Sequence, residues 1–248
     1  MSDRIDLNRA QTGAEVDAGL QAYMRGVFTQ MGAGVALTGL IAMLLGNWGV
    51  SNPLAFMGLF TGMAGWVLML SPLAIVLVAS FGFQRLSHAA LQACFWAYAS
   101  LIGVSFSMIA FQALIAANGG DLSLMSAVAN AFFAAAAAFL GAALYGYTTN
   151  NDITRFSGLF FMAIIGIFVA MIINLFLQST FMGYVISIFG VILFTALTAY
   201  DTQRLKMTYY EVGGTELGQK LAVMGALGLY INFVLIFQFL LSLFMSRD

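Results

Sequence analysis

The chain has 248 residues, of which 62% are hydrophobic and 8% are charged, and its mean hydropathy is +0.95. Soluble domains usually carry about 25% charged residues because they need a hydrated surface, so this composition predicts an integral membrane protein whose partner is the lipid bilayer. The net charge of −1 excludes the bulk basic field that draws nucleic acid.

The first 25 residues are polar and of mixed charge. They lack the apolar core and the small-residue cleavage site of a signal peptide, so we expect the first apolar segment to direct membrane insertion itself. The sequence therefore predicts a cytoplasmic N-terminal arm, residues 1–25, followed by a transmembrane domain, residues 26–248.

The stretches between charged residues are long enough for seven membrane-spanning helices, each of which needs about 20 mostly apolar residues. A Gly-, Asn- and Pro-containing turn at 46–53 divides the first two. In chain order the expected spans are 27–46, 54–79, 90–116, 123–148, two between Arg155 and Asp201 divided near 177–183, and one between Lys220 and Arg247. The fold class predicted is therefore an all-α membrane protein with seven transmembrane helices.

Lysine and arginine gather on one side of this arrangement. Cytoplasmic loops of membrane proteins carry an excess of these residues, which predicts a cytoplasmic N-terminus and an outside C-terminus. The eight residues on the expected cytoplasmic side, against Arg247 alone on the other, are Arg4, Arg9, Arg25, Arg85, Arg155, Arg204, Lys206 and Lys220.

Polar side chains inside the expected spans are functional candidates, because each costs free energy in the bilayer core. Two helices carry small polar residues at helical spacing, and the last helix carries an amide. The candidates are Ser100 and Ser107 around Gly103, then Thr195, Thr198, Asp201 and Thr202, and finally Asn232.

Asp201 allows two interpretations. In one, it pairs with Arg204 at i, i+3 near the membrane surface, which contributes roughly 0.2–0.5 kcal/mol. In the other, it faces the bundle interior and meets a polar group of another helix. The spacing alone leaves both open.

Several motifs resemble the bacterial branch of the Bax inhibitor-1 family, the transmembrane Bax-inhibitor-motif proteins. In order they are "YMRGVFTQMGAGVALTGLIA" (23–42), "SPLAIVL" (71–77), "YGYTTNND" (145–152), "LTAYDTQRLK" (197–206) and "ALGLYINFVLIFQFLLSLF" (226–244). The resemblance implies a bacterial inner-membrane protein with seven helices, the last surrounded by the other six. It also implies a calcium leak, which is pH-dependent in several members.

One position departs from the family pattern. The family's sixth-helix aspartate, here Asp201, commonly faces a second aspartate of the last helix in "LYLDF", whereas this chain has "LYINF" with Asn232. Two close carboxylates share a proton and can sense pH, but an amide supplies a donor and an acceptor without a charge. The resemblance therefore predicts a hydrogen-bonded Asp201–Asn232 pair in which the shared-proton switch is lost.

These observations predict a cation leak, with calcium as the expected ion, because hard cations prefer oxygen ligands. No resident metal and no cofactor are expected. The candidate gate and ion-path residues are Asp201, Asn232, Thr198, Thr195, Ser100, Ser107 and Arg204. The alternative is a regulatory partner of a membrane AAA protease or of another stress-response protein, without ion flux, as some bacterial family members are. Residues 1–25 would dock that partner, and the oligomeric state stays open.

Enzyme classes that work inside membranes do not fit. Aspartyl proteases need a second catalytic aspartate, typically in a GxGD stretch, and the chain has none. A rhomboid-type protease needs an intramembrane histidine, whereas the single His88 follows Arg85 in an expected loop. Zinc sites fail on ligand count. We therefore predict that the protein is not an enzyme.

Overall fold

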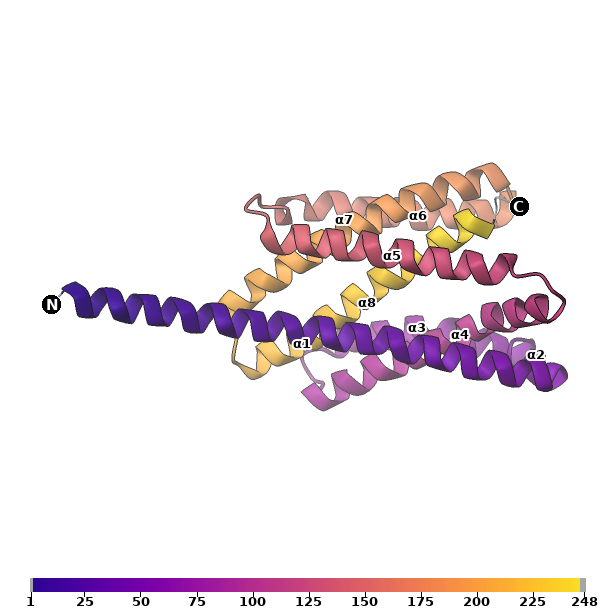
Figure 1. The fold of residues 1–248 in the computed structure, drawn as a ribbon, viewed down its shortest axis with the longest axis horizontal. Helices are drawn as coiled ribbons and strands as arrows, with labels where there is room; N and C mark the ends of the chain where they lie inside the picture. Colours follow the sequence, from indigo (N-terminus) through magenta and orange to yellow (C-terminus); the bar gives the residue numbers. More distant parts are fainter. Residues whose placement is uncertain (1, 246–248) are drawn as a thin grey trace.

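The computed structural model describes the backbone of residues 2–245 and the side chains of residues 18–245, and this part of the chain is a bundle of helices (Figure 1). The elements are α1 (Ser2–Ser51), α2 (Pro53–Leu59), α3 (Gly62–Gly82), α4 (His88–Asn118), α5 (Ser123–Thr148), the short 3-10 helix η1 (Thr154–Phe156), α6 (Ser157–Leu177), α7 (Thr180–Val212) and α8 (Glu216–Met245). Seven segments are long and apolar enough to cross a membrane: Ala18–Ser51 of α1, η1 with α6, and each of α3, α4, α5, α7 and α8. The predicted fold class and its seven spans are confirmed.

The start of α1 and the last turn of α8 lie at opposite ends of the bundle (Figure 1). An odd number of spans requires this arrangement. The loops that follow α3, α5 and α7 lie at the end where α1 begins. Most of the lysine and arginine residues therefore gather at that end, and which side of the membrane it faces stays a prediction.

The first helix is longer than the predicted span of 27–46. It runs without a break from Ser2 to Ser51, and its apolar part begins at Ala18. Charge spacing marks where the apolar region begins, but Arg, Gln, Glu and Ala all favour helix, so helix continues through the predicted arm. In Figure 1 the first turns of α1 project beyond the rest of the bundle.

The predicted second span, 54–79, is wrong in its bounds. The chain forms a short helix, α2, and then a second helix, α3, with the break at Phe60 and Thr61. Gly62 adopts φ +60°, a left-handed conformation that favours glycine. Pro53 stands in the first turn of α2, where its missing N–H costs nothing. Apolar composition alone does not reveal such a break.

Helix α8 lies at the centre, as the resemblance implied, and 56% of its most apolar stretch is buried within the protein. Its partners are α1, α4, α5 and α7. In contrast, α3 packs mainly on α4, and α6 mainly on α7. The immediate ring around α8 therefore has four helices, and α3 and α6 lie outside it (Figure 1).

Helices α5 and α7 approach closely at Gly146. A Cβ atom added there would overlap the backbone carbonyl of Ala199, which cannot swing aside as a side chain can. Small residues permit such contacts between helices in lipid. The contact holds the α5 end near the "YDTQ" stretch of α7.

We expect Gly146→Ala to destabilise the protein by about 1–3 kcal/mol, the usual cost of overpacking. Thermal unfolding in detergent micelles measures the loss. Gly141→Ala, on the same helix with open space around the added methyl group, is the matched control and should be neutral or stabilising because alanine favours helix. Equal midpoints for both variants would contradict the tight α5–α7 contact.

Candidate functional site

Asp201 of α7 and Asn232 of α8 form a hydrogen bond. The Asn232 amide Nδ2 donates to Asp201 Oδ2 at 2.7 Å. Asn232 is 5% exposed, and Asp201 is half-buried. The predicted pair is therefore present, and it joins the central helix to its neighbour.

A cavity of about 380 Å³ adjoins Asp201. It lies where the end of α3 approaches α7 and the first half of α8. Gly228 of α8 leaves space beside Asp201, since a Cβ atom added there would lie 3.9 Å from Asp201 Oδ2, whereas Gly225 packs closely against the Leu205 side chain. The lining residues are Ser80, Phe83, Asp201, Arg204, Leu205, Thr208, Leu221, Met224, Gly225 and Gly228. Asp201 is its one carboxylate, and Ser80 and Thr208 bring hydroxyl groups.

Arg204 lines the same cavity but does not pair with Asp201. Across residues 18–245 the one ion pair joins Lys220 to Glu216, at 3.3 Å. Arg204 is exposed. Of the two interpretations of Asp201, the intrahelical pair with Arg204 is therefore wrong, and the interior contact with another helix is the one observed.

The other candidate residues do not meet at this cavity. Each of three hydroxyl groups donates to a carbonyl of its own helix: Ser100 to Trp96 at 2.8 Å, Ser107 to Val104 at 2.6 Å and Thr198 to Phe194 at 2.8 Å. Gly103, between the two serines, lies against Thr38 and Ile41 of α1 rather than against α7. Thr195 lines a different cavity, between α5, α6 and α7.

The site offers few ligands for a resident metal ion. No group of three or more His, Cys, Asp or Glu side chains that could hold one occurs in the described part of the chain. Calcium takes six to eight oxygen ligands, whereas this cavity brings one carboxylate and a few neutral oxygens. Such a set suits brief, weak contact with a hydrated cation.

Comparison with known proteins identifies the family of this chain. The sequence model of the family described as "Inhibitor of apoptosis-promoting Bax1" matches residues 20–248. The chain belongs to the Bax inhibitor-1 family. It is 37% identical to an uncharacterized protein of Caulobacter vibrioides, over 98% of this chain and 93% of the relative. It is 35% identical to the inner membrane protein YbhL of Escherichia coli K12, over 96% of this chain and 97% of the relative.

Two residues of the "YDTQRLK" stretch have partners that sequence reasoning missed. Gln203 donates through Nε2 to the Asn151 carbonyl and accepts from the Ile153 N–H, both at 2.8 Å. Lys206 donates to the Tyr147 carbonyl at 3.1 Å, in the last turn of α5, where a cation is favoured. The resemblance rested on both "YGYTTNND" and "YDTQRLK", and the structure shows that these two motifs of the Bax inhibitor-1 family protein contact each other.

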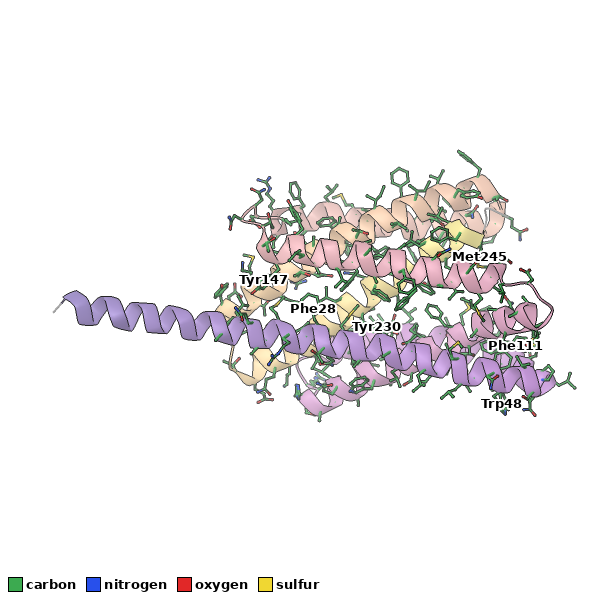
Figure 2. The ribbon with its side chains drawn as sticks, viewed as in Figure 1. Phe28, Trp48, Phe111, Tyr147, Tyr230 and Met245 are labelled. Atoms are coloured by element: carbon green, nitrogen blue, oxygen red, sulfur yellow. The ribbon has the colours of Figure 1, made fainter. Side chains whose placement is uncertain are left out.

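A second polar cluster, also missed, lies on the other side of α8. Tyr230 is 0% exposed and stands where α1 crosses the central helix (Figure 2). Its hydroxyl lies 2.6 Å from Thr38 Oγ1, which also contacts the carbonyls of Gly34 and Ala99 at 2.9 Å. Carbonyls only accept, so Thr38 donates its single proton to one of them and Tyr230 donates to Thr38. Hydroxyl residues on apolar helices are too common for spacing to reveal this cluster.

We expect Thr38→Val to destabilise the protein by about 1–3 kcal/mol, because it leaves the buried Tyr230 hydroxyl without a partner among the described residues. Tyr230→Phe should cost less, because Thr38 keeps its carbonyl partners. The double variant should be more stable than Thr38→Val alone. Unfolding midpoints of the four proteins in detergent complete the cycle. Simple additivity would contradict the Thr38–Tyr230 hydrogen bond, and a larger loss for Tyr230→Phe than for Thr38→Val would contradict the inferred donor direction.

Proposed function

We propose that this protein is a slow cation leak of the bacterial inner membrane, with calcium as the ion, and that the Asp201–Asn232 pair forms its gate. The supporting observation is a carboxylate on a membrane-spanning helix that borders a cavity and is held by an amide of the central helix. The likeness to an inner membrane protein of Escherichia coli supports the location. We infer that the protein is not an enzyme, because its family is described as an inhibitor of apoptosis-promoting Bax1 and not by a catalytic activity.

The Asp201 charge provides the attraction for a cation entering the cavity. Further along α7 and α8, the helices are closely packed: the rings of Phe194 and Phe239 stack at 5.9 Å, and Gly190 contacts the Phe239 ring. Conduction therefore requires α7 and α8 to separate, and breaking the Asn232–Asp201 hydrogen bond is part of that movement. A gate of this kind gives a slow leak.

A second candidate function is regulation of a membrane AAA protease or another stress-response protein, without ion flux. It is favoured by the start of α1, which projects beyond the bundle as a helix (Figure 1). A projecting polar segment is suited to contact a partner protein. The side chains of residues 1–17 lie outside those the structure describes, so this docking role rests on the helix and its sequence.

Orientation is a separate part of the proposal. We expect reporter fusions after Arg25, Gly119 and Asp248 to report inside, outside and outside. The reason is that lysine and arginine are concentrated at the end of the bundle where α1 begins, and such loops lie on the cytoplasmic side of membrane proteins. An inside signal at Asp248 would overturn the inferred orientation of the last helix.

The flux itself is tested with calcium-sensitive dye in proteoliposomes over a range of pH. We expect Asp201→Asn to lower flux about tenfold or more, because it removes the charge that attracts the cation, and a charged cleft raises the local counter-ion concentration roughly 10- to 1,000-fold. The asparagine oxygen still accepts the hydrogen bond from Asn232, so the gate contact is kept. Asn232→Asp places two carboxylates at hydrogen-bonding distance, where they share a proton, so flux should become steeply pH-dependent.

The matched control is Asp121→Asn. Asp121 lies in the loop between α4 and α5, where it accepts a hydrogen bond from the Ser123 N–H at 2.8 Å, far along the chain from the cavity. This variant should conduct as the wild type does. Wild-type flux no greater than that of empty vesicles at every pH would reject the leak and favour the partner function.

A further inference from the structure

A second and larger cavity, about 880 Å³, lies on a different face of α7 from Asp201. It is a groove between α5, α6 and α7 that the proposed leak does not use. Its lining residues are Ala138, Ala142, Tyr145, Asn151, Asp152, Ile153, Arg155, Phe156, Phe160, Val191, Ile192, Thr195, Ala196 and Ala199.

The groove has a floor of small side chains. Ala138 and Ala142 of α5 are four residues apart, and Ala196 and Ala199 of α7 are three apart, so each pair lies on one face of its helix. The groove follows α7 from Ala199 to Val191, eight residues, or about 12 Å along the helix axis. A slot of this length within the spanning region suits an apolar chain.

Charged residues stand at one end, in the connection between α5 and α6: Asp152 lies in the loop and Arg155 in η1. Asp152 and Arg155 both line the groove there. Neither forms an ion pair within residues 18–245. The guanidinium of Arg155 lies 4.8 Å from the centre of the Phe156 ring. Asp152 accepts hydrogen bonds from the Thr154 hydroxyl at 2.5 Å and from the Thr154 N–H at 2.9 Å.

Those two hydrogen bonds lower the pKa of the Asp152 carboxyl, the hydroxyl contributing more. The group is therefore ionised at neutral pH. The backbone N–H and the charge of Arg155 also lower this pKa, by less. The mouth of the groove thus holds one anion and one cation that attract each other without forming a close ion pair in the described residues. Gln203 fixes this loop by its two hydrogen bonds to Asn151 and Ile153, so the two charges are held in place before anything binds.

Thr195 lines the groove, and its hydroxyl is buried behind this surface with no hydrogen-bond partner in the described chain. A buried unsatisfied hydroxyl costs free energy, and an acceptor on a bound molecule would satisfy it after a small rotation. The groove therefore combines an apolar slot, a spare hydroxyl and two opposite charges at its mouth.

We propose that this groove binds a phospholipid with a zwitterionic, amine-bearing headgroup. Arg155 contacts the phosphate, for which guanidinium is well suited. Asp152 accepts hydrogen bonds from the ammonium group, and an acyl chain lies along the alanine floor. An anionic lipid without an amine would bring its charge next to Asp152, and a second protein helix would leave both charges without a complement.

The test is lipid retention by the full-length protein, measured by native mass spectrometry with phosphatidylethanolamine, phosphatidylcholine or phosphatidylglycerol added. Phosphatidylcholine keeps the charges of phosphatidylethanolamine but has no N–H to donate. We expect one phosphatidylethanolamine bound, preferred over phosphatidylcholine by up to about fivefold, the range of exposed charge pairs. Asp152→Asn should remove that preference, and Arg155→Gln should weaken retention of both lipids equally.

Ala196→Leu fills the floor and should remove the bound lipid. Its matched control is Ala64→Leu, at an exposed position of α3, and Arg85→Gln, in the loop after α3, is the control for Arg155→Gln. Equal retention of the three lipids by the wild type would overturn the proposal, as would equal retention by the two leucine variants. A change from dimer to monomer mass in Ala196→Leu would overturn it too, since a second copy of the chain would then be the occupant. The two charge variants alter exposed residues of the α5–α6 connection, so they decide the matter even where Ala196→Leu fails to fold.

Discussion

The central constraint in this structure is that α8 is buried by other helices in a protein surrounded by lipid. Its polar side chains must therefore find partners on neighbouring helices, because lipid offers none. Tyr230 and Asn232 are two residues apart, or about 200° around the helix axis. Tyr230 bonds to Thr38 of α1, and Asn232 bonds to Asp201 of α7. These two contacts fix the rotation of α8 about its own axis relative to α1 and α7.

The same geometry links the candidate gate to the lipid groove. In α7, Asp201 contacts α8, Gln203 holds the loop between α5 and α6, and Lys206 caps α5. A movement of α7 that separates Asp201 from Asn232 also acts on Gln203, and hence on the loop that carries Asp152 and Arg155. On our proposals, a lipid that favours one position of α7 would therefore shift the equilibrium of the gate, and gate opening would change lipid affinity by the same factor.

The sequence was sufficient for the fold because charged residues rarely lie in lipid: they bound five apolar runs, and turn signals divide two of these runs in two, which makes seven spans. It was also sufficient for the Asp201–Asn232 pair, where a known motif supplied the partner. It failed for Ser100 and Ser107, because a serine on a helix can satisfy its hydroxyl with its own backbone, and spacing does not distinguish that case from a shared polar path. It also failed at the α2–α3 break, where Gly62 adopts a backbone conformation that composition does not specify.

Asn232 changes how the proposed gate can be controlled. A carboxylate partner would gain or lose a proton, and the strength of the contact would follow pH. The Asn232 amide keeps its donors at every pH, so its hydrogen bond to Asp201 persists until the helices move apart. The contact is then controlled by movements of α7 and not by protonation of residue 232. Close to Asp201, α7 is hydrogen-bonded to the α5–α6 loop through Gln203, and it lines the groove that begins at this loop. On these proposals, the membrane itself is in a position to act on the proposed gate of this family member.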